Sequence, residues 1–372
     1  MVYINWRVIF IKQFNCLGTS SKIAICGLPL RADSYRTCSF MCSYCFSNNK
    51  VIRKTKDDEL QIANVKQLKT KMDKVFNKNI YDESNLVDIL LKDDITWHYG
   101  GMSDPFQHCE AQYEITKQIV DIANEYNRTI LFSTKTDNIY NVNLRPELHS
   151  IQMSFSNTLE ENYIEPGVPS LQNRIRFFNE MKDQGFKVGI RIQPFIPGIT
   201  NTELVEIFKD ADYFTIEGLK LVPQNKEMNE QLIKTLNLKR ENFTQKGLLN
   251  LKPELREKEY QDFISALREY NIPFSIADND MRSTTSGKCC CGDPLIHKST
   301  DFNVTAMIND KGNYDYTKND VLAKMNEQYK KASVKGLFTS NRQKDVNTLE
   351  DLIEANFDKK TNPLSPKFQY KK

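Results

Sequence analysis

The period of the hydrophobic and polar pattern changes repeatedly along the chain. Short apolar or alternating segments predict β-strands at residues 3–11, 33–37, 95–99, 129–133, 150–154, 187–193, 213–216 and 273–276. Charged segments and segments with apolar residues three or four positions apart predict helices at residues 57–77, 84–92, 110–126, 170–184, 202–211, 253–270 and 318–331. Gly185 follows one of these helices, where a glycine commonly ends the last turn.

Strands and helices alternate in this pattern, which predicts βαβ units and a parallel sheet. About six such units fit before residue 225, fewer than the eight of a closed TIM barrel. We therefore expect an α/β fold with a partial, open TIM-type barrel and a C-terminal extension. The expected parts are an N-terminal segment (1–32), the partial barrel (33–225), a C-terminal cover with a cysteine-rich loop (226–300) and a polar peripheral extension (301–372).

Three cysteines with the spacing C-x3-C-x2-C follow the strand predicted at residues 33–37. They are Cys38, Cys42 and Cys45. A cubane [4Fe–4S] cluster is held by thiolates, so three ligands leave its fourth iron open for another molecule. A structural zinc site usually has four ligands, commonly two C-x2-C pairs, and only Cys42 and Cys45 form such a pair here. The spacing therefore favours a cluster over a zinc site or simple packing.

Composition narrows the class of protein. In 372 residues, 40% are hydrophobic and 27% are charged, which is typical of a globular protein. The net charge of +3 means that any nucleic-acid surface would be a local basic patch. Nine cysteines indicate metal or redox use in a reducing compartment, because Arg7 interrupts the only apolar stretch that could form a signal peptide. We expect a cytoplasmic protein with no membrane association.

Glycine and small polar residues follow the strand predicted at residues 95–99. Gly100 and Gly101 would let the backbone approach a ligand closely, although an ordinary tight turn uses the same residues. Ser103 and Asp104 would either cap the next segment or contact that ligand. We expect this segment to lie near the cysteines, because active sites of such folds lie at the carboxyl ends of the strands.

Three further polar residues lie near the ends of later strands. Lys135 follows the strand predicted at 129–133, and it would either neutralise a carboxylate or lie in solvent. Ser154 could bond a hydroxyl group at the end of the next strand. Arg191 lies on the strand predicted at 187–193.

The order of these segments resembles a known family. The cysteine loop, the Ser-Asp-Pro segment at 103–105, Glu165 to Ser170, Arg174 and the residues 185–198 are similar to the spore photoproduct lyase-like (DNA repair photolyase-like) branch of the radical S-adenosylmethionine (SAM) superfamily. The resemblance covers about residues 33–200. It implies a cluster whose open iron chelates SAM, and reductive cleavage of SAM to a 5′-deoxyadenosyl radical that abstracts hydrogen from a substrate. The residues that it implies for SAM binding are Tyr44, Gly100, Gly101, Ser103, Lys135, Ser154 and Arg191.

Each implied contact has its own chemistry. Tyr44 would lie near the adenine, although it could equally be a core aromatic residue. The glycines would bind the amine of SAM and Lys135 its carboxylate, and Ser154 would bond the ribose. An electron donor such as flavodoxin or ferredoxin is also implied.

One departure from the family bears on the substrate. The lyases carry a hydrogen-donating cysteine two residues before the Ser-Asp pair, and Gly101 stands there in this chain. We therefore expect no efficient repair of the thymine lesion, with Cys109 as a substitute donor or a packed thiol. The resemblance favours a nucleobase or nucleotide substrate, and the lyase or oxidoreductase type stays open. Modification of a peptide or small metabolite, and a non-catalytic metal-binding protein, are the alternatives.

The consecutive Cys289, Cys290 and Cys291 are unusual. We expect adjacent side chains to diverge, so that they cannot share one metal without another cysteine, and we expect one cluster per chain. A second metal site, substrate-facing thiols and plain packing remain alternatives. The other thiols that could contribute are Cys16, Cys26 and Cys109. The nearby Asp278 to Asp280 would face substrate or form a turn.

Overall fold

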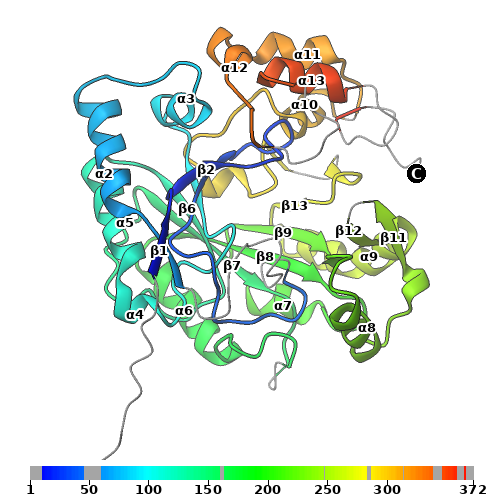
Figure 1. Ribbon diagram of the computed structural model, residues 1–372. Helices are drawn as coiled ribbons and strands as arrows, with labels where there is room; N and C mark the ends of the chain where they lie inside the picture. The colour runs from blue at the N-terminus through cyan, green and yellow to red at the C-terminus, as the bar shows by residue number, and fades with distance from the viewer. Residues whose placement is uncertain are drawn as a thin grey trace, which may run out of the picture.

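The centre of the molecule is an eight-stranded sheet in the order β13, β9, β8, β7, β6, β5, β3, β2 (Figure 1). The computed structural model describes residues 11–45, 60–159, 163–246, 248–282, 286–312, 314–337, 346–357 and 364–365. All neighbouring strands are parallel except β2 and β3. The strands are β2 (Leu17–Thr19), β3 (Leu30–Ala32), β5 (Trp97–Tyr99), β6 (Ile130–Thr134), β7 (His149–Phe155), β8 (Lys187–Phe195), β9 (Tyr213–Gly218) and β13 (Phe274–Ile276).

Helices and two small sheets surround this sheet. Parallel β1 (Ile11–Phe14) and β4 (Leu60–Ala63) form one small sheet, and antiparallel β10 (Lys220–Leu221), β12 (Leu248–Leu251) and β11 (Phe243–Lys246) form the other. The helices are α2 (Val65–Met72), α3 (Leu86–Lys92), α4 (Glu110–Tyr113), α5 (Ile115–Glu125), α6 (Leu171–Asp183), α7 (Glu203–Ile207), α8 (Lys226–Thr235), α9 (Pro253–Glu269), α10 (Val304–Lys311), α11 (Lys318–Lys324), α12 (Glu327–Lys331) and α13 (Leu349–Asn356). None of these described helices is long and apolar enough to cross a membrane.

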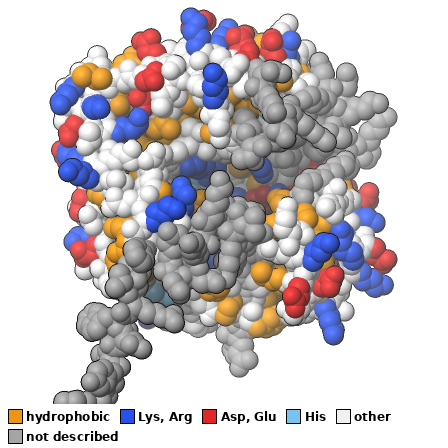
Figure 2. Space-filling view, in the orientation of Figure 1, with side chains coloured by type: hydrophobic (Ala, Val, Ile, Leu, Met, Phe, Trp, Pro, Cys, Tyr) orange, Lys and Arg blue, Asp and Glu red, His pale blue; other side chains and the backbone are white. Residues whose placement is uncertain are grey.

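The two faces of the sheet differ in polarity because side chains alternate along each strand. Ile190 on β8 and Phe214 on β9 belong to an apolar cluster with residues of α6, α7 and α9. The opposite face carries polar side chains such as Arg191 and Glu217. Lys22 in the β2–β3 connection acts electrostatically on Glu217 of β9. Figure 2 shows the molecule hollowed across its middle, with basic and acidic side chains inside.

The predicted α/β class with an open, barrel-like parallel sheet is confirmed. The strand predicted at residues 33–37 is wrong, because β3 ends at Ala32. Tyr35 lies beyond the strand, and its hydroxyl donates a hydrogen bond to Glu110. The helix predicted at 57–77 is also wrong in its first part. Residues 60–63 form β4, and Asn64 caps α2 by accepting a hydrogen bond from the Gln67 amide at 2.9 Å.

Two predicted helices are interrupted. The helix expected at 110–126 breaks at Glu114, which has a φ of 49°. The Glu110 carboxylate replaces the missing cap of α5, because it accepts hydrogen bonds from the amides of Thr116 and Lys117 at 2.9 Å. The helix expected at 318–331 splits at Asn326, which caps α12. The helix expected at 202–211 is shorter, and α7 ends at Ile207.

The chain after residue 301 packs more closely than its polar composition predicts. Phe302, Met307 and Tyr316 are buried in the same apolar cluster as Trp97 of β5. Figure 1 shows α10, α11, α12 and α13 grouped together at the top of the view. The sequence did not predict α8, α10, α13 or the β10–β12 sheet. The strand expected at 3–11 lies outside the described residues except for Ile11, and the four part boundaries remain predictions.

Candidate functional site

The cysteine loop, residues 38–45, follows β3 at the carboxyl end of the sheet. The Gln107 side chain holds its first residues, because it accepts a hydrogen bond from the Ser39 amide at 2.8 Å and donates one to the Thr37 carbonyl at 2.7 Å. Phe40 is buried at 2% exposure. This bidentate contact fixes the backbone around Cys38 from the β5 side of the sheet.

The segment after β7 holds the loop from the other side. The Gly167 amide donates to the Phe40 carbonyl at 3.1 Å, and the Ser43 amide donates to the Ile164 carbonyl at 2.9 Å. A Cβ atom on Gly167 would lie 2.5 Å from the Ser39 carbonyl oxygen. Glycine is therefore required at residue 167 by close approach to the loop.

The three thiols of the loop act electrostatically on one another. Burial and the Asp104 carboxylate raise the pKa of Cys38 to about 11. Burial and Glu165 raise the pKa of Cys42 as well. Without a metal these two thiols stay protonated, and a bound cation would displace their protons. Three thiols on one short loop that act electrostatically on one another are a donor set that suits a [4Fe–4S] cluster.

A buried ionic network lies beside the cysteine loop. The Lys135 ammonium is 2.7 Å from Glu165, whose side chain is 1% exposed, and the Tyr44 hydroxyl donates to the same carboxylate. Burial alone would raise the pKa of Glu165, but Lys135 and Arg174 outweigh it and hold this pKa at about 2. Lys135 also donates to the Ser154 carbonyl at 3.4 Å. The network joins the segments at the ends of three strands, β3, β6 and β7, around an ionised carboxylate.

Arg174 on α6 also contacts this network. Its guanidinium donates to the Ser154 carbonyl and stacks 3.8 Å from the centroid of the Phe155 ring. The arginine is 2% exposed, so its charge depends on Glu165 for compensation.

In the Gly100 to Asp104 segment, Ser103 and Asp104 hydrogen-bond to neighbouring backbone groups, and contact of this segment with a cofactor remains a prediction. Gly100 has a φ of 94°, and a Cβ there would lie 2.4 Å from the Ser133 carbonyl oxygen. Gly101 has more room, since its nearest neighbour would be Arg31 at 3.8 Å. Ser103 donates to the Tyr35 carbonyl at 2.6 Å and thereby ties this segment to the approach of the cysteine loop.

Asp104 organises the following turn. Its carboxylate accepts hydrogen bonds from the amides of Phe106 at 3.0 Å and Lys135 at 2.6 Å, and from the Thr134 hydroxyl at 2.9 Å. These contacts position the backbone from which the Lys135 side chain reaches Glu165. Asp33 fixes the neighbouring backbone, because it accepts from the Met102 amide at 2.8 Å.

Arg191 lies in a different environment from the other candidate residues. It pairs with Ser154 in the β7–β8 register, yet its guanidinium binds Glu217 at 2.9 Å and Gln152 at 3.3 Å. It also acts electrostatically on the thiols of Cys289, Cys290 and Cys291. The expectation that these adjacent thiols diverge is wrong, because their sulfur atoms lie within 4.8 Å of one another.

The structure therefore brings most candidate residues together around Glu165. These are Cys42, Tyr44, Lys135 and Ser154, with Cys38 and Cys45 on the same loop. Their roles in SAM binding remain predictions. Sequence reasoning did not assign Gln107 or the Glu165–Arg174 pair to the site. Glu165 and Arg174 were visible as part of the family-like block, whereas Gln107 carries no local signal.

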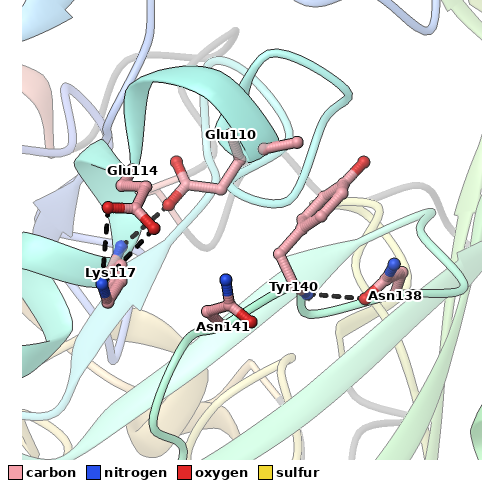
Figure 3. Close-up of a pocket in the computed structure, with 7 residues that line it drawn as sticks. Glu110, Glu114, Lys117, Asn138, Tyr140 and Asn141 are labelled. Carbon is pink, nitrogen blue, oxygen red and sulfur yellow. Dashed lines mark hydrogen bonds and ion pairs between the residues drawn. The ribbon is translucent and has the colours of Figure 1, made fainter.

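A pocket of about 360 Å³ lies where α4 meets α5, close to the loop after β6 (Figure 3). Glu110 and Glu114 both point toward Lys117 on one side, and Tyr140 and Asn138 line the other. The acidic groups have partners within the protein, since Glu110 caps α5 and Glu114 pairs with Lys117 at 3.3 Å. The pocket is explained by the break between the two helices.

Comparison with known proteins identifies the fold. No protein-family model matches the chain, and neither does any curated protein. Among solved structures, spore photoproduct lyase complexed with dinucleoside spore photoproduct has a TM-score of 0.51 and 13% identity, with 70% of this chain and 78% of that chain covered. A cysteine-to-serine mutant of that lyase gives the same score, identity and coverage.

Streptococcus suis SuiB bound to S-adenosylmethionine has a TM-score of 0.36 at 14% identity, with 58% of this chain and 49% of that chain covered. This TM-score is too low to indicate a shared fold. The chain thus shares its open α/β fold with spore photoproduct lyase. In particular, the predicted resemblance to spore photoproduct lyase is confirmed at the level of the fold.

Proposed function

We propose that this chain is a radical SAM enzyme of the spore photoproduct lyase-like branch. The observation that carries the proposal is the cysteine loop, whose backbone is held at the carboxyl end of the sheet with three thiols beside the Glu165 network. Cys38, Cys42 and Cys45 would hold a [4Fe–4S] cluster, and its open iron would bind SAM. When bound, the two cofactors supply reductive cleavage of SAM and hydrogen abstraction from a substrate.

The protein's own residues position the cofactors and exclude water. Lys135 and Tyr44 are already oriented by Glu165, so each enters the site with its side chain fixed. The glycine at residue 101 leaves space beside the loop for the amino-acid part of SAM. Ser154 and Arg191, which pair across β7 and β8, would complete the SAM site along the strand ends.

The substrate is proposed to be a nucleobase or nucleotide. The lyase with the shared fold was solved with a dinucleoside, which favours this class over a peptide or small metabolite. Gly101 supplies no thiol where the lyases carry the donor, so the reaction would differ from repair of spore photoproduct. Flavodoxin or ferredoxin would supply the electron in the cytoplasm, in keeping with nine cysteines in the chain.

Cleavage of SAM tests this proposal directly. After anaerobic reconstitution with iron and sulfide, the wild-type chain with SAM and dithionite should form 5′-deoxyadenosine. The variant C38A/C42A/C45A should form none, whereas C289S/C290S/C291S should still form it. Undiminished cleavage by the first variant would refute the assignment. With the dinucleotide lesion as substrate, we expect no catalytic formation of thymidylyl-thymidine, and turnover would show that another residue, such as Cys109, donates hydrogen.

A further inference from the structure

Three thiols outside the cysteine loop converge at one point in the fold. Cys289, Cys290 and Cys291 occupy a turn that is closed by a hydrogen bond of 3.1 Å from the Gly292 amide to the Cys289 carbonyl. Adjacent side chains alternate in an extended strand, but a tight turn gathers them. The three sulfurs accordingly lie within 4.8 Å of one another.

This separation distinguishes a single ion from a cluster. Zinc–sulfur bonds of about 2.3 Å in a tetrahedral site place the sulfurs about 3.8 Å apart. In a cubane each thiolate binds a different iron, so its ligands lie farther apart than those of one ion. The turn therefore has the geometry of a mononuclear site.

The backbone of the turn is held by side chains from three strands of the sheet. The Cys290 carbonyl accepts hydrogen bonds from Thr215 at 2.7 Å and Ser275 at 2.6 Å. The Cys291 carbonyl accepts one from Gln152 at 3.2 Å. Because the sheet side chains bond to these carbonyls, the turn is held in place before any ion binds. This preorganisation reduces the entropy cost of metal binding.

The surrounding charges favour an anionic metal–thiolate group. Three thiolates and one divalent ion carry a net charge of −1. Arg282 hydrogen-bonds to the Cys290 thiol, and Arg191 and Lys22 also act electrostatically on Cys290. Glu217 acts on the same cations, but it already pairs with Arg191 at 2.9 Å. The group thus has excess positive charge around it, and Arg282 provides the hydrogen bond to a ligand that metal sites commonly show.

We propose that Cys289, Cys290 and Cys291 bind one soft divalent metal ion, such as Zn²⁺, at a site separate from the cysteine loop. Three protein thiolates leave a fourth position of a tetrahedral ion for another ligand. Cys26 belongs to the same side-chain cluster and supplies a further thiol. Gly27 next to it lies against the turn, since a Cβ there would come within 2.9 Å of the Cβ of Cys289.

Cobalt is the probe, because Co²⁺ bound to thiolates absorbs strongly in the near ultraviolet. The full chain carrying C38A/C42A/C45A is titrated anaerobically, so that no iron–sulfur absorption interferes. We expect saturation at one Co²⁺ per chain and displacement by one Zn²⁺. The same background with C289S/C290S/C291S should show no thiolate absorption, whereas the matched control C16S, which removes a buried thiol outside the turn, should titrate like its parent.

Absence of thiolate absorption in the parent, or its persistence after C289S/C290S/C291S, would overturn the proposal. If the triple serine variant does not fold, C290S replaces only the half-buried thiol. It should weaken Co²⁺ binding at least about tenfold with an unchanged circular dichroism spectrum, and unchanged affinity would overturn the proposal. The background cannot cleave SAM, so the outcome is independent of the proposed enzymatic function.

Discussion

The two groups of thiols differ in spacing and in the charges that surround them. In the cysteine loop the thiols are spread over eight residues and face the carboxylates Glu165 and Asp104. In the turn at residues 289–292 they are consecutive and face Arg191 and Arg282. Spaced thiols can reach separate irons, whereas gathered thiols fit one ion. In the loop, burial together with Asp104 and Glu165 raises the pKa of Cys38 and Cys42. In the turn, hydrogen bonds from Cys289 and Cys291, together with Arg282 and Arg191, lower the pKa of Cys290, whereas the pKa values of Cys289 and Cys291 are raised.

Replacing the cysteines of the loop and those of the turn in separate variants should produce the largest difference in iron and sulfide content. Reconstituted wild-type protein should contain about four irons and four acid-labile sulfides, the content of one cubane. C38A/C42A/C45A should lose essentially all sulfide because the gathered thiols of the turn fit one ion. C289S/C290S/C291S should retain about four sulfides. A wild-type value near eight that falls to about four in the turn variant would show that the turn also holds a cluster.

The carboxylate that distinguishes the cysteine loop should also matter for stability. Glu165→Gln leaves Lys135 and Arg174 buried without their counter-charge, so we expect a loss of about 3 to 5 kcal/mol in the free energy of unfolding at pH 7. Urea unfolding of the metal-free protein measures this loss. The matched control is Glu257→Gln on the exposed side of α9, which should change stability by less than about 0.5 kcal/mol.

The pH dependence follows from the same residue. The pKa of Glu165 is depressed to about 2 from an ordinary value of 4.5, so its contribution is fully present above about pH 4.5 and is lost as the pH falls through 2. The stability gap between wild type and Glu165→Gln should therefore be largest at neutral pH and shrink in acid. A gap that stays constant from pH 7 to pH 3 would contradict the ionised state of Glu165.

The sequence predicted elements whose patterns are local. The helix at 170–184 has a serine that caps α6 and a terminal glycine, and β8 and β9 carry clear apolar runs, so all three were found close to their bounds. The strand at 33–37 failed because tertiary contacts override the local pattern. The partners of Tyr35 are Glu110, far away in sequence, and a bridge to Ile62.

The candidate site divides in the same way. The C-x3-C-x2-C spacing is a local pattern and therefore predicts the cysteine loop. The two hydrogen bonds between Gln107 and this loop span 68 and 70 residues and have no local pattern. The convergence of Cys289 to Cys291 was missed because it depends on carbonyl contacts with Thr215 and Ser275. The rule that adjacent side chains alternate along an extended strand does not apply to a turn whose carbonyl groups bond to residues of the sheet.

The smallest expected effect concerns one of those carbonyl contacts. Ser275→Ala removes one hydrogen bond to the Cys290 carbonyl, and Thr215 still donates to the same oxygen at 2.7 Å. We therefore expect a loss of about 1 kcal/mol in the free energy of unfolding, with the sulfide content unchanged. Metal binding at the turn should weaken only a few-fold and stay at one Co²⁺ per chain, because no ligand is lost. The control is Ser265→Ala on exposed α9, whose hydroxyl donates to the Gln261 carbonyl at 2.9 Å and which should be neutral or slightly stabilising. If Ser275→Ala abolished metal binding while unfolding stayed unchanged, the Ser275 hydroxyl would act on the metal site itself and not through the backbone of the turn.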